Sequence, residues 1–257
     1  MPLKLRFHLH GPPPASPFQH GAGLQALVLG WVAAGDPDTA ARLHDANQPK
    51  PYAISPLWPA AGDADSRFFD VSLLVDSLAQ LLIDGASRSA SVQLGPLCYR
   101  LRGDVESRDS VSYPELVAQA KPTSTRFRLR LLTPTAHHAP GDFRKAIVLP
   151  SPENYFGSWL NRWNVCAPIG IDDCLLATVE RHVAVCACAG RTERVEMDRG
   201  RSHIGFIGEV MFEVLKPNLV AESDIKALAA LARVATYCGT GVGTTRGMGQ
   251  TEVSTDN

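Results

Sequence analysis

A glycine-rich run near the C-terminus is the most unusual chemical feature of the sequence. Residues 238–250 read CGTGVGTTRGMGQ and hold five glycines, with two threonines and an arginine between Gly243 and Gly247. Glycine adopts positive φ angles without steric cost, so successive N–H groups of such a run can turn toward one anion. The run leaves a predicted helix and enters a strand, whereas nucleotide-binding loops lead from a strand into a helix. It therefore favours an anion contact or a tight connection over a nucleotide site.

Two strictly alternating segments carry basic side chains on one face. The first, residues 3–10 (LKLRFHLH), has a polar row of Lys4, Arg6, His8 and His10. The second, residues 126–132 (RFRLRLL), has a row of Arg126, Arg128 and Arg130. Neither row contains an acid, and Lys and Arg supply most of the affinity of proteins for nucleic acid. Both rows predict a phosphate-lined surface, with a solvated strand face as the alternative.

Patterns for metal binding are weak. His8 and His10 share a strand face, but no third ligand stands at a suitable spacing. Six cysteines are too few for a disulfide scaffold at this length, and none forms a C-x-x-C pair. Cys186 and Cys188 fall on one strand face, where packing is favoured over metal or redox chemistry. The sequence predicts no metal site and no cofactor.

Composition excludes several classes of protein. A chain of 257 residues with 45% apolar and 20% charged residues is not collagen-like, a coiled coil or wholly disordered. Its length suits one large domain or two of about 125 residues each. The net charge is −1, so a polyanion site must be local. Because no apolar run approaches about 18 residues and no signal peptide is evident, we expect a cytoplasmic protein with no membrane partner.

The first half follows the element order of a ferredoxin-like unit. Prolines close the strand at residues 3–10, and apolar residues at helical spacing predict a helix over 21–35. Asp36-Pro37 predicts the start of a second helix that ends near residue 46. The expected order is completed by strands near 52–57 and 67–71, a helix near 73–83 and a strand near 91–101.

The second half repeats this order after polar, helix-breaking residues at 121–124. Its expected elements are a strand at 126–132, an irregular loop at 137–141, a helix at 151–164, a hairpin of 174–189 with 204–215, a helix at 222–237 and a strand at 251–253. The sequence therefore predicts an α+β protein with two tandem ferredoxin-like (RRM-like) βαββαβ domains, residues 1–124 and 125–257.

Three segments carry a family resemblance. They are residues 23–57 (GLQALVLGWVAAGDPDTAARLHDANQPKPYAISPL), 205–214 (GFIGEVMFEV) and 235–253 (ATYCGTGVGTTRGMGQTEV). Together they resemble the CRISPR-associated repeat-specific endoribonucleases of the RAMP superfamily, which process CRISPR precursor RNA. The glycine-rich run is the most specific part, and the order of helix, HD and KPY is second. The resemblance also implies two ferredoxin-like domains, in agreement with the expected element order.

The resemblance implies cleavage of an RNA repeat without a metal ion. The 2′-hydroxyl attacks the neighbouring phosphate, which leaves a 2′,3′-cyclic phosphate and a 5′-hydroxyl. Such a reaction needs a group that takes the 2′-hydroxyl proton, a group that protonates the leaving 5′-oxygen, and positive charge beside the phosphorane. A histidine and a lysine suit these needs.

By this resemblance the family's catalytic histidine falls on His44 and its catalytic lysine on Lys50. His44 lies in the last turn of its expected helix, where the helix dipole favours an imidazolium. Lys50 stands between two prolines that restrict the backbone. The tyrosine that some members use as a third group aligns with Leu29, so His20 or Tyr52 is the expected replacement.

The resemblance also implies RNA contacts in the second domain. The implied contact residues are Arg126, Arg128, Arg130, Arg191, Arg194, Gly241, Gly243, Thr244, Thr245, Arg246, Gly247 and Gly249. Arg199 and Arg201 stand in the same hairpin segment as Arg191, together with acidic residues. Recognition of A-form RNA through backbone and shape needs only correctly spaced cations.

The implied partner is a CRISPR repeat RNA stem-loop, with a CRISPR effector complex as a further implied partner and no nucleotide cofactor. One alternative is a non-cleaving subunit that binds the repeat RNA, which would be favoured if His44 pointed into the core. A second alternative is a small-molecule phosphate enzyme that uses the glycine-rich run.

Overall fold

The computed structural model describes residues 1–45, 49–139, 141–197 and 202–255, which form two compact units. Unit 1 consists of Met1–Ser110, Val195–His203 and Thr245–Gly247. Unit 2 consists of Val111–Arg194, Ile204–Thr244 and Met248–Asn257. The predicted domain ranges, 1–124 and 125–257, stay a prediction. In the part of the chain that is described, no helix is long and apolar enough to cross a membrane.

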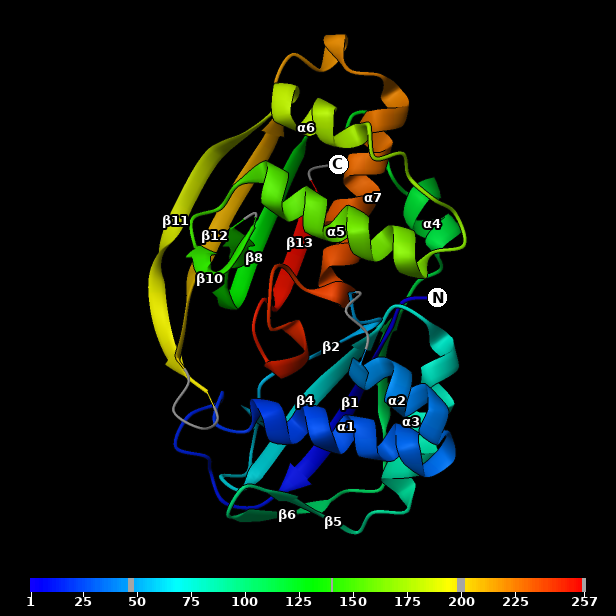
Figure 1. The fold of residues 1–257 in the computed structure, drawn as a ribbon, viewed down its shortest axis with the longest axis vertical. Coiled ribbons are helices and arrows are strands. Elements are labelled where there is room, and N and C mark those ends of the chain that lie inside the picture. Colours follow the sequence, from blue (N-terminus) through cyan, green and yellow to red (C-terminus); the bar gives the residue numbers. More distant parts are fainter. Residues whose placement is uncertain (46–48, 140, 198–201, 256–257) are drawn as a thin grey trace. The chain divides into compact units, whose positions relative to one another are not determined.

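Unit 1 is built on an antiparallel sheet with the strand order β2-β4-β1-β6-β5 (Figure 1). Its central strand β1 pairs with β4 along its whole length, and its other edge pairs with β6 and β7. The short strand β3 pairs with β4. The bounds are β1 (Leu3–His10), β2 (Tyr52–Ile54), β3 (Trp58–Pro59), β4 (Ser66–Leu73), β5 (Ser91–Leu94), β6 (Leu97–Leu101) and β7 (Glu106–Ser110).

Helices cover one face of this sheet (Figure 1). They are α1 (Gly21–Gly35), α2 (Pro37–Asp45), the 3₁₀ helix η1 (Asp76–Leu78) and α3 (Ala79–Ser87). Trp31 of α1 packs on the aromatic rings of Phe7 and Phe69, at centroid distances of 5.0 and 6.2 Å. As predicted, the apolar face of β1 and the apolar face of α1 pack together in this core.

The predicted helix near residues 73–83 begins later than expected. Strand β4 continues to Leu73, because Leu73 still pairs with Leu3, and the helical turns start only at Asp76. The predicted strand near 91–101 is a hairpin of β5 and β6, with Gly95 at a φ of 60° in its turn. Apolar residues continue across these boundaries, so periodicity could not place them.

Unit 2 repeats the architecture with the strand order β11-β12-β8-β13. The first strand is central, the third and fourth strands flank it, and the second strand lies at an edge, as in a ferredoxin-like unit. The strands are β8 (Arg126–Thr135), β11 (Val183–Glu196), β12 (Ser202–Val214) and β13 (Thr251–Thr255). The helices are α4 (Tyr113–Ala118), α5 (Pro152–Cys166), α6 (Leu175–His182) and α7 (Glu222–Cys238), with the 3₁₀ helix η3 (Pro217–Leu219). The 3₁₀ helix η4 (Thr244–Arg246) has its first residue in unit 2 and the other two in unit 1. The predicted tandem ferredoxin-like fold is confirmed.

Two predicted elements of the second half were wrong. Residues 175–182 form α6 and not the start of a strand, because Leu175 and Val179 stand four residues apart and bury one helical face. The expected loop at 137–141 contains β9 (His137–Ala139), which pairs with β10 (Asp142–Ile147). Helix α4 was missed, although a capping box formed by Ser112 and Glu115 marks its start.

Two glycines test the packing of α1 against α3. A Cβ added to Gly85 of α3 would lie 2.5 Å from the Cβ of Trp31, whereas one added to Gly30 of α1 meets nothing within 4 Å. We expect Gly85→Ala to lower the free energy of unfolding by about 1–3 kcal/mol through overpacking. Gly30→Ala is the matched control and should raise it by about 0.5–1 kcal/mol. Urea unfolding followed by circular dichroism measures both, and equal stabilisation by the two variants would refute this packing.

Candidate active site

The structure brings His44 and Lys50 together at the C-terminal end of α2. The Lys50 ammonium donates hydrogen bonds to the carbonyl oxygens of Leu43 and His44, at 2.6 and 3.2 Å. The last carbonyls of a helix lack partners within the helix and carry partial negative charge, so an ammonium is well placed there. The His44 side chain is exposed. The two predicted catalytic residues thus share one helix end that substrate can reach.

Local sequence explains this geometry. Asp36 accepts a hydrogen bond from the backbone N–H of Thr39 at 2.9 Å, which starts α2 at Pro37. After the helix, Tyr52 enters β2, and the N–H of Leu74 donates to the carbonyl of Pro51 at 2.8 Å. Lys50 is therefore fixed by the sheet that begins directly after it. Residues 46–48, between the two catalytic candidates, lie outside the described residues.

His20, the predicted third group, directly precedes α1 and is 2% exposed. Its Nε2 lies 3.3 Å from the Tyr99 hydroxyl, and the two rings meet edge to face with centroids 6.0 Å apart. With Gln19 and Glu196 it also lines a pocket of 430 Å³ in unit 1. Burial and the hydrogen bond favour a role of His20 in fixing the start of α1.

The other candidate for a third group, Tyr52, is a core residue, and Leu29, which aligns with the family's tyrosine, packs against the core. Tyr52 is 2% exposed in β2. Burial raises the pKa of its hydroxyl, and the Gln25 side chain offsets this effect in part. Leu29 packs against the hydrophobic core of unit 1. Neither position presents a group suited to proton transfer near neutral pH.

The glycine-rich run packs closely where its glycines stand. A Cβ on Gly241 would lie 2.1 Å from the Ala136 carbonyl oxygen, and one on Gly249 would lie 2.0 Å from that of Thr240. The N–H groups of Thr240 and Gly249 donate to the carbonyl oxygens of Gly249 and Pro134, at 2.8 and 3.0 Å. This half of the run is therefore a tight connection, and these N–H groups are already used within the protein.

Residues 243–247, in the middle of the glycine-rich run, pack against other parts of the chain than Gly241 and Gly249 do. Gly243, with a φ of 73°, lies against Met248, and Thr244 is buried at 5% exposure. Within unit 1, residues 245–247 lie beside the start of α1. A Cβ on Gly21 would lie 2.6 Å from the Arg246 carbonyl oxygen, and Gly247, with a φ of 94°, lies against Pro56. Arg246 and Thr245 are half-buried there, next to the residue that follows His20.

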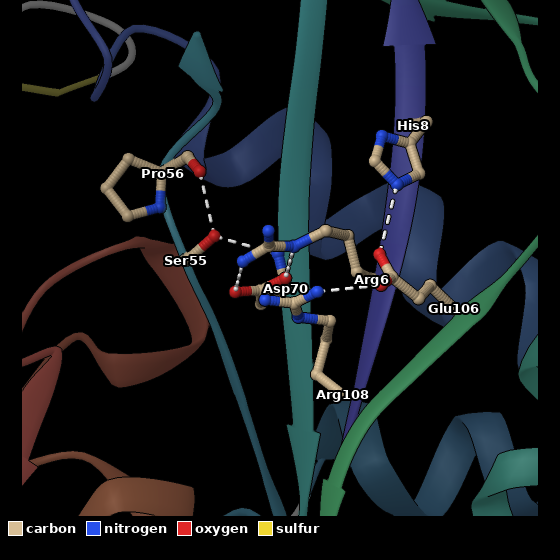
Figure 2. Close-up of polar contacts among 7 residues, drawn as sticks. All are labelled: Arg6, His8, Ser55, Pro56, Asp70, Glu106 and Arg108. Carbon is tan, nitrogen blue, oxygen red and sulfur yellow. Dashed lines mark hydrogen bonds and ion pairs between the residues drawn. The ribbon is translucent and has the colours of Figure 1, made fainter. Parts of the chain in front are cut away.

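Three of the four basic side chains in the row of β1 lie beside carboxylates, so the row is not the open phosphate surface that was predicted. Figure 2 shows two of these contacts, those of Arg6 and His8. Two hydrogen bonds of 2.7 and 2.9 Å join the Arg6 guanidinium to the Asp70 carboxylate. His8 lies 3.4 Å from Glu106, which also accepts from Arg108 at 2.7 Å. His10 lies 3.4 Å from Asp63. Acids from β4, β7 and the loop before β4 supply the negative charge that the row itself lacks.

Neighbouring groups fix the ion pair of Arg6 and Asp70 (Figure 2). The Ser55 hydroxyl accepts from the Asp70 N–H and donates to the Pro56 carbonyl, both at 2.8 Å. The Arg6 guanidinium also lies 3.7 Å above the centre of the Phe68 ring. The hydrogen bond to Asp70 raises the pKa of Arg6. This face of unit 1 is organised for cohesion between strands.

The arginine row of β8 is partly neutralised in the same way. Arg126 pairs with Glu213 at 3.1 Å and Arg130 with Glu252 at 3.6 Å. Arg128 stands in register between the uncharged Met211 and Ser254, and it lines two cavities of 410 and 190 Å³. Of the three arginines, Arg128 is thus the best placed to meet an outside anion.

Arg191 and Arg194 of the predicted hairpin lie on β11. Arg191 pairs with Glu193 at 2.7 Å, and Arg194 is exposed. Arg199 and Arg201 lie outside the described residues. Within the described ranges, no group of three or more His, Cys, Asp or Glu side chains could hold a metal ion.

The chain has two ferredoxin-like units, and a histidine and a lysine meet at the end of one of its helices. It is therefore a tandem ferredoxin-like protein with a candidate acid–base site. The family model described as CRISPR-associated endoribonuclease Cas6 matches residues 129–251. This match covers just under half of the chain and agrees with the resemblance found in the sequence. A search of the curated proteins finds no match.

Solved structures of Cas6 proteins match nearly the whole chain. The structure titled "Cas6 (TTHB231) product complex" has a TM-score of 0.85 and 25% identity, over 99% of this chain and 100% of that chain. "Cas6 (TTHA0078) product complex" has a TM-score of 0.80 and 23% identity, over 98% and 99%. "Thermus thermophilus Cas6 (TTHB231)" has a TM-score of 0.72 and 23% identity, over 99% and 98%.

The effect of substitution on the free energy of unfolding should differ between the two histidines of the predicted site. We expect His20→Ala to lower the free energy of unfolding by about 1–3 kcal/mol, because it removes a buried hydrogen-bonded side chain. His44→Ala should change it by less than about 0.5 kcal/mol, because that side chain is exposed. Urea unfolding of the two variants under one condition checks this, and a larger loss for His44→Ala would contradict the assignment.

Proposed function

We propose that this chain cleaves CRISPR precursor RNA within the repeat and so releases mature guide RNAs. The 2′-hydroxyl attacks the neighbouring phosphate, and the products carry a 2′,3′-cyclic phosphate and a 5′-hydroxyl. The observation that carries the proposal is the Lys50 ammonium bound to the end of the helix whose last turn presents His44. Two of the matched Cas6 structures are titled product complexes, which supports an RNA ligand for this fold.

His44 transfers the proton in this proposal. Imidazole exchanges protons near neutral pH, so it can take the 2′-hydroxyl proton or protonate the 5′-oxygen as it leaves. The side chain is exposed in the last turn of α2, so an RNA strand can reach the imidazole. If His44 had a packing role, its ring would be buried, as the ring of His20 is.

Lys50 stabilises the charge that develops on the phosphorane. Its ammonium is held by two main-chain carbonyls before substrate arrives, which removes the cost of orienting a flexible side chain during the reaction. These carbonyls also fix the ammonium next to the backbone of His44. The pair therefore provides proton transfer and positive charge at one place, and the proposed chemistry needs no metal ion.

The other side chains proposed to contact RNA are exposed or half-buried cations. Arg128 and Arg194 are exposed cations of unit 2, and Arg246 lies beside the start of α1 in unit 1. The glycines of the run shape the backbone that presents Thr245 and Arg246. In this proposal these groups contact the repeat stem-loop. The reaction takes place in the cytoplasm, and a CRISPR effector complex receives the product.

A non-cleaving repeat-RNA-binding subunit is the alternative function. That function would be favoured if His44 pointed into the core. The exposed side chain of His44 and its neighbour Lys50 favour cleavage.

End-group analysis of a labelled CRISPR repeat tests the proposal. In EDTA, the wild-type protein should cut the repeat once and leave a 2′,3′-cyclic phosphate and a 5′-hydroxyl. His44→Ala should lower the cleavage rate by at least about 10²-fold, because proton transfer in the transition state is lost. Its RNA affinity should be nearly unchanged.

His10→Ala is a matched control, because it removes another partly exposed imidazole of unit 1 that pairs with Asp63 on the sheet. We expect this variant to cleave at the wild-type rate. Cleavage that required magnesium, or that survived His44→Ala, would overturn the proposed chemistry.

A further inference from the structure

An arginine of helix α5 contacts the glycine-rich run through uncharged groups alone. Arg162 is half-buried in unit 2. One terminal nitrogen of its guanidinium donates to the Gly241 carbonyl oxygen at 2.7 Å. The other donates to the hydroxyl and the carbonyl oxygen of Ser158, at 2.5 and 3.5 Å. Among the described residues, no carboxylate pairs with this guanidinium, so its positive charge is not neutralised by them.

This charge acts on the groups around it. Burial is the main cause that lowers the pKa of His137 to about 4, and the charge of Arg162 adds to this effect. Burial raises the pKa of Cys238 to about 11, and Arg162 counteracts part of this rise. Charges that are partly removed from water are normally paired. Arg162 thus differs from Arg6 and Arg126, each of which meets a carboxylate.

The peptide group between Gly241 and Val242 is held at both ends. Its carbonyl accepts from Arg162, and its N–H donates to the Ala136 carbonyl oxygen at 2.9 Å. The C=O and N–H groups of a trans peptide point in opposite directions, so rotation of this peptide would break both hydrogen bonds. Gly241 has a φ of 79°, and glycine by itself permits many other conformations. The arginine therefore restricts the backbone where the sequence leaves it most free.

A second side chain of α5 holds the preceding residue of the run. The Trp159 indole N–H donates to the Thr240 hydroxyl at 3.1 Å, and this hydroxyl also lies 2.8 Å from that of Thr251. Trp159 stands three residues before Arg162, so the two side chains share one side of the helix. Trp159 is fully buried and belongs to the core, whereas Arg162 is only half-buried. Arg162 is thus the charged member of this support.

We propose that Arg162 is a positioning residue for RNA binding. Its guanidinium fixes the 241–242 peptide and so holds the glycine-rich run in the conformation that contacts RNA, and its charge favours a phosphate at the run. This inference rests on the proposed function for the RNA contacts of the run. It assigns no proton transfer to Arg162, so the affinity for RNA should depend on this residue and the cleavage of bound RNA should not.

Amide hydrogen exchange of the RNA-free protein, followed by NMR, tests the positioning. Arg162→Gln removes the charge and shortens the side chain, so the Gly241 carbonyl loses its partner. We expect the Val242 amide to exchange at least about 10-fold faster than in the wild-type protein. Arg162→Lys keeps a charged donor and should restore most of the protection. Amides of the central strand β8 should exchange at the wild-type rate in both variants, which shows that unit 2 stays folded.

Arg233→Gln is the matched control. Arg233 is a half-buried arginine of α7 in the same unit, and it donates to the side-chain oxygen of Gln119. Its substitution makes the same change in charge and should leave the exchange of the Val242 amide unchanged. Unchanged exchange of this amide in Arg162→Gln, or equally fast exchange in Arg233→Gln, would overturn the inference.

A labelled CRISPR repeat separates binding from cleavage. With a 2′-deoxy nucleotide at the cleavage position, fluorescence anisotropy should show that Arg162→Gln raises the Kd at least about 10-fold, and Arg162→Lys less, because a hydrogen bond to a charged group is lost. The single-turnover rate at saturating protein should stay within about 2-fold of the wild-type rate. Wild-type affinity in Arg162→Gln, or the same loss in Arg233→Gln, would contradict the proposal.

The two proposals fail in different ways. His44→Ala should show the reverse pattern, with a lower rate and a nearly unchanged Kd. A wild-type protein that binds the repeat without cutting it would refute the proposed cleavage, and the effects of Arg162→Gln on hydrogen exchange and on the Kd would still support the role of Arg162.

Discussion

The hydrogen bonds from the Lys50 ammonium to the last carbonyls of α2 are the interaction on which the proposed site depends. A helix end attracts a cation because its final carbonyls lack partners. The same contact ties the lysine to the backbone of His44. A charge and an imidazole are thereby held at one helix end, although five residues, 45–49, separate them in the chain. The antiparallel sheet supports this contact, since Tyr52 enters β2 two residues after Lys50.

Most of the basic side chains in the rows of β1 and β8 pair with acids. The basic row of β1 meets Asp70, Glu106 and Asp63, and two arginines of β8 meet glutamates of the neighbouring strands. Ion pairs of this kind fix strand register more than they add stability, because most of them are solvent-accessible. Of the arginines in the row of β8, Arg128 is the cation that lies outside these ion pairs and is proposed to contact RNA in unit 2. This agrees with a net charge of −1 for the chain.

Periodicity was sufficient to predict β1 and α1, because in these elements one face is more buried than the other. Apolar spacing also predicted α7, although most of this helix is buried, and the tandem fold followed from the order of the elements. Periodicity could not reveal that Arg6 meets Asp70, 64 residues later, because such partners become neighbours only through the sheet. The contact of the Lys50 ammonium with the carbonyls of Leu43 and His44 could not be predicted either, because it joins residues six and seven positions apart that share no periodic pattern. For the glycine-rich run, the sequence left a tight connection and an anion contact open. The structure supports close packing at Gly241 and Gly249.

The central claim is that His44 and Lys50 act on one scissile phosphate. A structure of this chain bound to a CRISPR repeat RNA, with a 2′-deoxy nucleotide at the cleavage position to prevent the reaction, measures this directly. We expect the His44 imidazole and the Lys50 ammonium to lie within hydrogen-bond distance of that phosphate or of its 5′-oxygen. A scissile phosphate bound away from the C-terminal end of α2, with neither side chain in contact, would contradict the claim.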